Sequence, residues 1–299
     1  MKKSFSMFCA LITTFIWGTA FIAQDTGMDN IGPLTFNSSR FFVGFLTILP
    51  FAILIEKNKI KKEIEKNSKL FIKYLIFMGV SLFLGTFLQQ AALQYTNIAN
   101  AAFFTVFYVP FVPIILFIIY KEKVHWSIWP SIAHCIVGVY LLTDFSDAEI
   151  MLGDTLVIFC SIFWALHIIF AGKFMQNFNI PVFYAALQAA FVFSLSIFFA
   201  FIFEEVILSN ILLELSSILY AGALSGGIAF TLQMYAQKNI EEAPAAIIYS
   251  LEGVFAAIAG WIILDQFLKF NNIIGCLLIL FAVILSQILP CLLYTSDAA

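Results

Sequence analysis

The chain has 299 residues, of which 62% are hydrophobic and only 11% are charged, and its mean hydropathy is +1.00. Soluble domains carry about 25% charged residues. This composition therefore excludes an ordinary soluble globular protein and indicates a polytopic membrane protein. The five cysteines are scattered and show neither C-x-x-C nor metal-ligand spacing, so we expect no metal site and no cofactor.

Runs of about 20 apolar residues, the length at which a helix crosses a bilayer, recur throughout the chain. The polar breaks between them are short, apart from the lysine-rich stretch 56–69, and they leave no room for a soluble domain. Function must therefore reside within a helical bundle. We predict an all-α integral membrane protein with ten spans, at 5–24, 33–55, 71–94, 98–120, 126–143, 152–172, 181–203, 211–236, 243–264 and 270–289.

The basic residues distinguish the two sides of the membrane. Cytoplasmic loops carry an excess of Lys and Arg. With a cytoplasmic N-terminus, thirteen lysines fall on the inner side, whereas the outer side receives only Lys269. An even number of spans then returns the C-terminus to the cytoplasm. We expect a multi-pass protein of the bacterial cytoplasmic (inner) membrane with both termini inside.

Equivalent positions recur in the two halves of the chain. A shift of 144 positions aligns Gln89 with Gln233, and Tyr108 with Glu252, among matching apolar residues. Such self-similarity indicates an internal repeat. Because each half holds five spans, the two halves would cross the membrane in opposite directions.

Inverted five-helix repeats are a transporter architecture, with the substrate site near the midplane between the halves. The sequence divides accordingly, and its last residues break the helical pattern after a proline. We predict a first repeat at 5–143, a second repeat at 152–289, and a disordered or artefactual tail without function at 290–299.

Glu252 lies about ten residues inside the ninth apolar segment, which places it close to the bilayer midplane at about 1.5 Å per residue. A carboxylate at that depth costs about 2.5–3.5 kcal/mol on insertion scales, so it must face protein or water. Two roles are open for it. It is either a structural carboxyl group, protonated or paired, or a group that lines a cavity or relays a proton.

Arg40 is the only arginine among the fifteen basic residues, and it lies within the second span. Its guanidinium group stays charged and presents a planar fork of donors. Three roles are open for this group. It meets a substrate carboxylate, it pairs with Glu252, or it caps backbone carbonyl groups of a neighbouring helix.

The fourth span contains two prolines. Pro110 and Pro113 lack the backbone N–H of a helix and leave carbonyl groups that need other partners. We therefore expect this span to bend beside Tyr108.

Further aromatic and polar side chains lie deep within the predicted spans. Trp is usually enriched at membrane interfaces, so the two tryptophans at mid-span either line a cavity or simply pack. His167 shares a helix face with Trp164, and the glutamines either bond across helices or line a wet path. We predict a midplane cavity lined by Trp17, Arg40, Gln89, Tyr108, Trp164, His167, Gln233, Tyr249 and Glu252.

Several motifs follow the pattern of one known family. They are FIWGTAF (15–21), Pro33 with Arg40-Phe41, the segment 92–114 followed by Lys121-Glu122, Trp164, Gln188, SLEGVFAAIAGWIILDQ (250–266) and GCLLILFAVIL. With these motifs nearly the whole chain resembles the drug/metabolite transporter superfamily, with two EamA-type domains. The family usually has Pro after the Glu of the ninth span and Gly-Glu at that span's end. Gly253 and Asp265-Gln266 stand there instead, so the resemblance gives no basis for a kink in this span.

The resemblance implies a ten-helix carrier, often an exporter, of small organic solutes such as amino acids, metabolites or amphiphilic drugs. Its partners would be a small-molecule substrate, the lipid bilayer and a proton as coupling ion, with no nucleic acid. An intramembrane enzyme is a competing class, but H-E-x-x-H, G-x-S-x-G and a Gly-rich phosphate loop are all absent from the sequence. A sensor or assembly subunit, the third class, would usually need a soluble output domain.

The lysine distribution predicts which loops an external reagent can reach. Single cysteines introduced near Asp29 and Asp147 should react with a membrane-impermeant thiol reagent in intact cells. A cysteine near Lys61 should not react, because the positive-inside rule places that loop in the cytoplasm. Reaction at Lys61 in sealed cells would reverse the orientation and remove the inverted-repeat argument.

Overall fold

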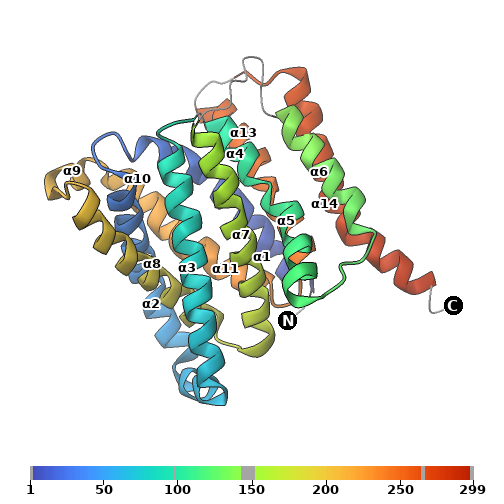
Figure 1. Ribbon diagram of the computed structural model, residues 1–299, viewed down its shortest axis with the longest axis horizontal. Coiled ribbons are helices and arrows are strands. Elements are labelled where there is room, and N and C mark those ends of the chain that lie inside the picture. Colours follow the sequence, from blue (N-terminus) through green and yellow to red (C-terminus); the bar gives the residue numbers. More distant parts are fainter. Residues whose placement is uncertain (1–2, 97, 143–151, 264–266, 297–299) are drawn as a thin grey trace.

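The computed structural model describes residues 3–96, 98–142, 152–263 and 267–296, and every regular element within these ranges is helical (Figure 1). The helices are α1 (Lys3–Thr26), α2 (Pro33–Lys66), α3 (Ser68–Ala92), α4 (Ile98–Thr105), α5 (Tyr108–Ile115), η1 (Leu116–Tyr120), α6 (Ile128–Leu142), α7 (Leu152–Asn177), α8 (Pro181–Phe203), α9 (Leu208–Leu213), α10 (Leu215–Leu219), η2 (Tyr220–Ala229), α11 (Phe230–Ala236), α12 (Glu242–Tyr249), α13 (Leu251–Ile263) and α14 (Phe270–Ser296).

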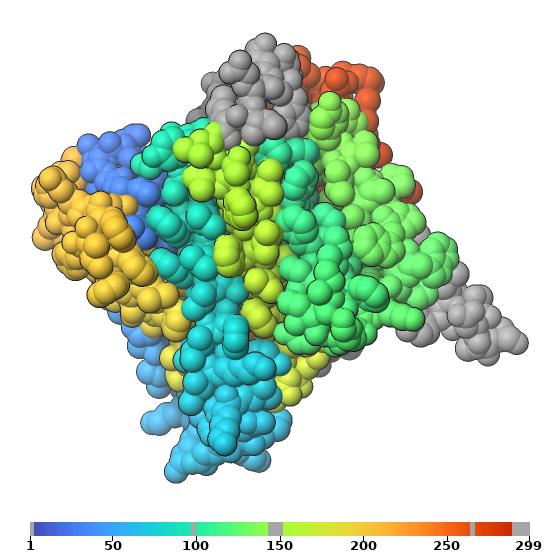
Figure 2. Space-filling model, in the orientation of Figure 1, coloured from blue at the N-terminus to red at the C-terminus, as the bar shows by residue number. Residues whose placement is uncertain are grey.

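Within the described residues, nine helical stretches are long and apolar enough to cross a membrane, and the shorter apolar helix α6 adds a tenth. The prediction of an all-α membrane protein with ten spans is confirmed. Large apolar side chains cover the outside of the bundle, such as Leu54 and Phe203, because the surrounding hydrocarbon favours them. Figure 2 shows one face of the bundle, where α7 lies between α3 and α5.

The contacts between helices follow the two-fold relation between the halves, in which spans one to five correspond to spans six to ten. Corresponding spans pair with each other where α2 packs along α8 and where α6 packs along α14. The remaining contacts occur in matched sets. The third span (α3) packs on the sixth (α7), and the eighth (η2 and α11) packs on the first (α1).

Two carboxylates fasten α2 to α8 at opposite ends of the bundle. Glu204, at the end of α8, accepts hydrogen bonds from the backbone N–H groups of Leu34 and Thr35 at the start of α2, both at 2.8 Å. Glu56 of α2 likewise accepts hydrogen bonds from the first turn of α8, including one from the N–H of Phe183 at 2.8 Å. The N–H groups of a helix's first turn have no partner within the helix, so a carboxylate there supplies missing acceptors and meets the positive end of the dipole.

Spans four and nine are both interrupted near their middles. The fourth span breaks between α4 and α5, close to the two prolines, as the predicted bend beside Tyr108 requires. It then continues into the π-helix η1. In the ninth span, Ser250 separates α12 from α13, and its hydroxyl donates to the backbone oxygen of Ile247 at 2.6 Å. The family motif gave no reason to expect this second break, because the proline that usually follows the Glu of this span is replaced by Gly253. The helix is interrupted here without a proline.

Some element boundaries differ from those predicted. The eighth span is irregular, because the ten-residue π-helix η2 stands where a regular helix was expected. The helix α14 continues past Pro290 to Ser296, although the sequence predicted that the last span ends at 289. A proline removes one helical hydrogen bond and strains the preceding turn, but it does not by itself end a helix whose flanking residues remain apolar.

The cap on α2 can be tested by removing its carboxylate. Glu204→Ala should lower the free energy of unfolding by about 1–2 kcal/mol, because it leaves several first-turn donors of α2 without an acceptor. The neighbouring exposed residue Glu205 offers a matched control with the same change of charge. Thermal unfolding in detergent should therefore separate Glu204→Ala from Glu205→Ala, and equal midpoints would contradict the capping role.

Candidate functional site

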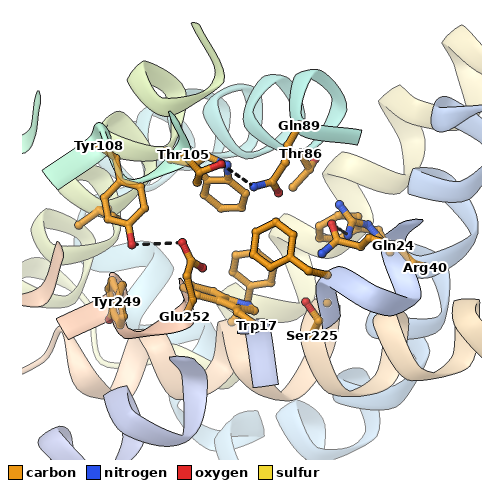
Figure 3. A pocket seen from close by; sticks show the side chains of 16 residues that line it. Trp17, Gln24, Arg40, Thr86, Gln89, Thr105, Tyr108, Ser225, Tyr249 and Glu252 are labelled. Carbon is orange, nitrogen blue, oxygen red and sulfur yellow. Dashed lines mark hydrogen bonds between the residues drawn. The ribbon is translucent and has the colours of Figure 1, made fainter. Parts of the chain in front are cut away.

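A cavity lies in the middle of the bundle, between side chains from both halves of the chain (Figure 3). The space among these side chains amounts to about 560 Å³, and the centre of a water molecule can occupy about 40 Å³ within it. It is lined by Trp17, Phe21, Gln24, Arg40, Phe41, Thr86, Gln89, Thr105, Tyr108, Trp164, Ile168, Ser225, Gly226, Phe230, Tyr249 and Glu252.

The two equivalent residues Tyr108 and Glu252 meet at one end of the cavity. Each lies at the start of the half-helix that follows a break, Tyr108 in α5 and Glu252 in the first turn of α13. The hydroxyl of Tyr108 donates to Oε1 of Glu252 at 3.3 Å. The breaks thus present polar side chains and helix N-termini to the cavity, as the interrupted helices of transporters do.

Arg40 lies at the opposite end of the cavity from Glu252 (Figure 3). Its Nε donates to Oδ1 of Asn37 at 3.0 Å, and one terminal nitrogen donates to Oε1 of Gln24 at 2.6 Å. The rings of Phe36 and Phe41 lie 5.7 Å and 5.2 Å from the guanidinium carbon. All of these partners are uncharged.

Arg40 and Glu252 do not form an ion pair with each other. In the ion pairs found across the described ranges, neither Arg40 nor Glu252 takes part. Of the roles open for Arg40 from sequence, pairing with Glu252 is therefore not seen. The guanidinium group of Arg40 and the carboxyl group of Glu252 thus lie in one buried space, each held by neutral hydrogen-bond partners.

Aromatic rings form much of the wall between these two ends. Trp17 lies 6.2 Å from Trp164 between ring centroids, 5.2 Å from Phe230 and 5.5 Å from Tyr249. The two equivalent tryptophans therefore contact each other across the interface between the halves. Rings at this separation form a continuous apolar surface.

Of the nine residues predicted to line the cavity, the structure brings seven together and places His167 and Gln233 elsewhere. His167 packs edge-on against Phe230, and it is the Phe230 ring that faces the cavity. Gln233 lies one turn further along α11. Sharing a helix face with a cavity residue was thus not sufficient, because the larger ring fills the intervening space.

Sequence reasoning missed several polar residues of the wall. Gln24, Thr86, Thr105 and Ser225 all line the cavity. Thr86 lies three residues before Gln89 and therefore on the same face of the helix. This spacing could have predicted from the sequence that Thr86 lines the cavity. Gln24 was less visible, because it lies near the end of its span, where polar residues are ordinary.

No group of three or more His, Cys, Asp or Glu side chains suited to a metal ion occurs among the residues that the structure describes.

Comparison with known proteins agrees with this architecture. The model of the EamA-like transporter family matches the chain twice, over residues 4–144 and 151–287. The chain belongs to the EamA-like transporter family. It is therefore a multi-pass membrane transporter, for which a small-molecule substrate and a lipid environment are implied.

Individual relatives support the family without defining a substrate. An uncharacterized transporter of Archaeoglobus fulgidus is 30% identical over 285 residues, which is 95% of this chain and 86% of that protein. The uncharacterized transporter YoaV of Bacillus subtilis is 24% identical over 275 residues, 89% of this chain and 91% of that protein. One solved crystal structure is similar with a TM-score of 0.76 at 14% identity, covering 96% of this chain and 98% of that one, which shows the shared fold alone.

The position of Glu252 depends on a close helix crossing at Gly18. A side-chain carbon at this glycine would lie only 2.5 Å from the backbone oxygen of Glu252. Gly18→Ala should therefore push α1 away from α13 and lower the free energy of unfolding by about 1–3 kcal/mol. Gly253→Ala is the control, since its added carbon meets nothing closer than Leu142 at 3.5 Å; the crossing is unimportant if both variants unfold at the same temperature.

Proposed function

We propose that this protein is a secondary transporter that exports small organic solutes by alternating access around the central cavity. The observation that carries this proposal is the presence of Arg40 and Glu252 at opposite ends of one buried space without an ion pair between them. Burying an unpaired charge is costly. A solute that brings the complementary charges would recover part of that cost on binding.

The charges favour a solute that carries both a negative and a positive group, such as an amino acid. Its carboxylate would meet the planar fork of Arg40, which suits bidentate contact. Its ammonium group would meet Glu252 and the aromatic ring of Tyr108 or Tyr249, because ring faces attract cations. An apolar side chain would then lie on the surface formed by Trp17, Trp164 and Phe230.

Glu252 would also couple transport to protons. The carboxyl group can hold either a proton or the cationic group of the solute, but not both. Proton and solute would therefore compete for it, which is the minimal requirement for exchange. In the contrary mechanism, facilitated diffusion, Glu252 only shapes the cavity and transport follows the solute gradient alone.

The membrane and orientation complete the proposal. The distribution of lysines supports a bacterial cytoplasmic (inner) membrane location with both termini inside. In this orientation the end of the bundle where α2 finishes at Lys66 faces the cytoplasm. The Arg40 end of the cavity then lies nearer the outside, because Arg40 is close to the start of α2.

The proposal is tested in proteoliposomes with a screen of amino acids and amphiphilic cations, run with and without an imposed pH gradient. Glu252→Gln preserves size and hydrogen bonding but cannot titrate. It should abolish pH-driven accumulation while leaving counterflow, and Arg40→Gln should weaken the apparent affinity for a zwitterion by about 10- to 100-fold, as expected for a lost charged hydrogen bond.

Glu241→Gln provides the matched control, because Glu241 is exposed and lies outside the cavity. Its transport should equal that of the unmodified protein. Continued accumulation by Glu252→Gln in response to the pH gradient would refute proton coupling. Failure of every zwitterion to be transported would refute the proposed substrate class.

A further inference from the structure

Most of the buried polar atoms that lack a hydrogen-bond partner within the described ranges gather on α7, α8 and α11, including the residue after α11. They belong to Trp164, His167, Tyr184, Gln188, Gln233 and Gln237. The extreme case is Gln233, whose side chain is fully buried and whose two amide atoms both lack a partner. Unsatisfied polar groups in an apolar interior cost several kcal/mol each and require an explanation.

Trp164 belongs to the cavity wall itself, and the other side chains lie at one shared interface behind it. His167 of α7 bonds Gln188 of α8, with 3.1 Å between Nε2 and Oε1, and its ring packs on Phe230 of α11. Gln237 donates to the backbone oxygen of Ile168 on α7 at 2.7 Å. Gln233 lies between Phe230 and Gln237 on the same face of α11, so the stripe runs from the cavity wall towards the end where α2 finishes.

An aromatic cluster closes the stripe at that end. The rings of Phe174 and Tyr184 are stacked with centroids 3.5 Å apart, and Phe71 and Phe178 pack against them. The hydroxyl of Tyr184 is one of the atoms without a partner. Polar groups are thus enclosed between Phe230 on one side and this cluster on the other.

The interface has a counterpart in the first half of the chain. Helices α7 and α8 correspond to α1 and α2, and the eighth span, which ends in α11, corresponds to α3. The helices α1, α2 and α3 supply seven of the residues that line the present cavity. Gln233 corresponds to Gln89, and Gln188 follows Pro181 at the spacing at which Arg40 follows Pro33. Gln89 and Arg40 both line the open space, whereas their counterparts are enclosed without full hydrogen bonding.

We propose that α7, α8 and α11 contain a second solute-binding cavity, closed in this structure, which opens towards the end where α2 finishes as the present cavity closes. This inference rests on the proposed alternating access, and it explains the enclosed amides as groups that bind water or solute in the other conformation. A neutral amide, Gln188, there takes the place of the guanidinium of Arg40. The second cavity would therefore hold a carboxylate more weakly than the first, which gives the two faces of the transporter different affinities.

The test is the reactivity of introduced cysteines in purified protein in lipid nanodiscs, where both faces are accessible. Gln233→Cys should react with a trimethylammonium-ethyl methanethiosulfonate reagent at least tenfold faster than Met234→Cys. Both native side chains are fully buried on the same helix, but Met234 corresponds to Gln90, which does not line the present cavity. The unmodified protein gives the background from the native cysteines.

Equal or undetectable rates for the two variants would overturn the second cavity. If Gln233→Cys does not fold, Gln188→Cys against Ala186→Cys makes the same comparison on α8, since Ala186 is buried and corresponds to Ser38, which also lies outside the cavity. The labelling needs no substrate, so its result stands apart from transport. If the labelling rates differ tenfold but no tested solute is transported, the second cavity is supported and the proposed substrates are refuted. If the rates are equal in a protein that transports a tested solute, only the second cavity is refuted.

Discussion

The arrangement of this bundle depends on one constraint, which is that backbone N–H and C=O groups cannot be left facing lipid. Interrupted helices are therefore tolerated only where protein surrounds the freed groups. The breaks in spans four and nine lie at the centre, where α5 and α13 begin beside the cavity. Helices α6 and α14 contribute none of the residues that line the cavity, and they pack mainly against each other.

The two ionisable groups at the ends of the cavity are held in a way that does not favour stability. Pairing a buried arginine with a buried acid would at least offset part of the desolvation cost of each. Here the partners of Arg40 are amides and rings, and Glu252 receives a phenolic hydroxyl. Neutral partners orient both groups without pairing them with each other.

Symmetry and its violations have separate roles in this fold. The caps by Glu56 and Glu204 are equivalent and fasten α2 to α8 at both ends. Site residues instead differ between the halves. Tyr108 corresponds to Glu252, and the counterpart of Arg40 is the neutral Gln188. Of the two ionisable groups at the ends of the cavity, Arg40 therefore comes from the first half and Glu252 from the second.

Patterns in the sequence were sufficient to predict the number of spans and their arrangement in two halves. Apolar run lengths, the lysine asymmetry and the 144-residue shift indicated ten helical spans and an inverted repeat, because bilayer thickness fixes span length and hydrocarbon excludes charge. They also singled out Arg40 and Glu252, since a charge within a span is rare enough to be visible in the sequence. The two prolines likewise placed the break of the fourth span.

Only the tertiary structure decided which polar residues share a space. His167 had the right depth but lies behind Phe230, and Gln233 lies one turn further along α11. In contrast, Gln24 and Thr105 reach the cavity from positions that no pattern marked. The break at Ser250 was hidden as well, because it arises without the expected proline. Depth in the membrane follows from position along the chain, but the facing of a side chain depends on helix rotation and on the size of the neighbouring rings, which are set by packing between distant segments.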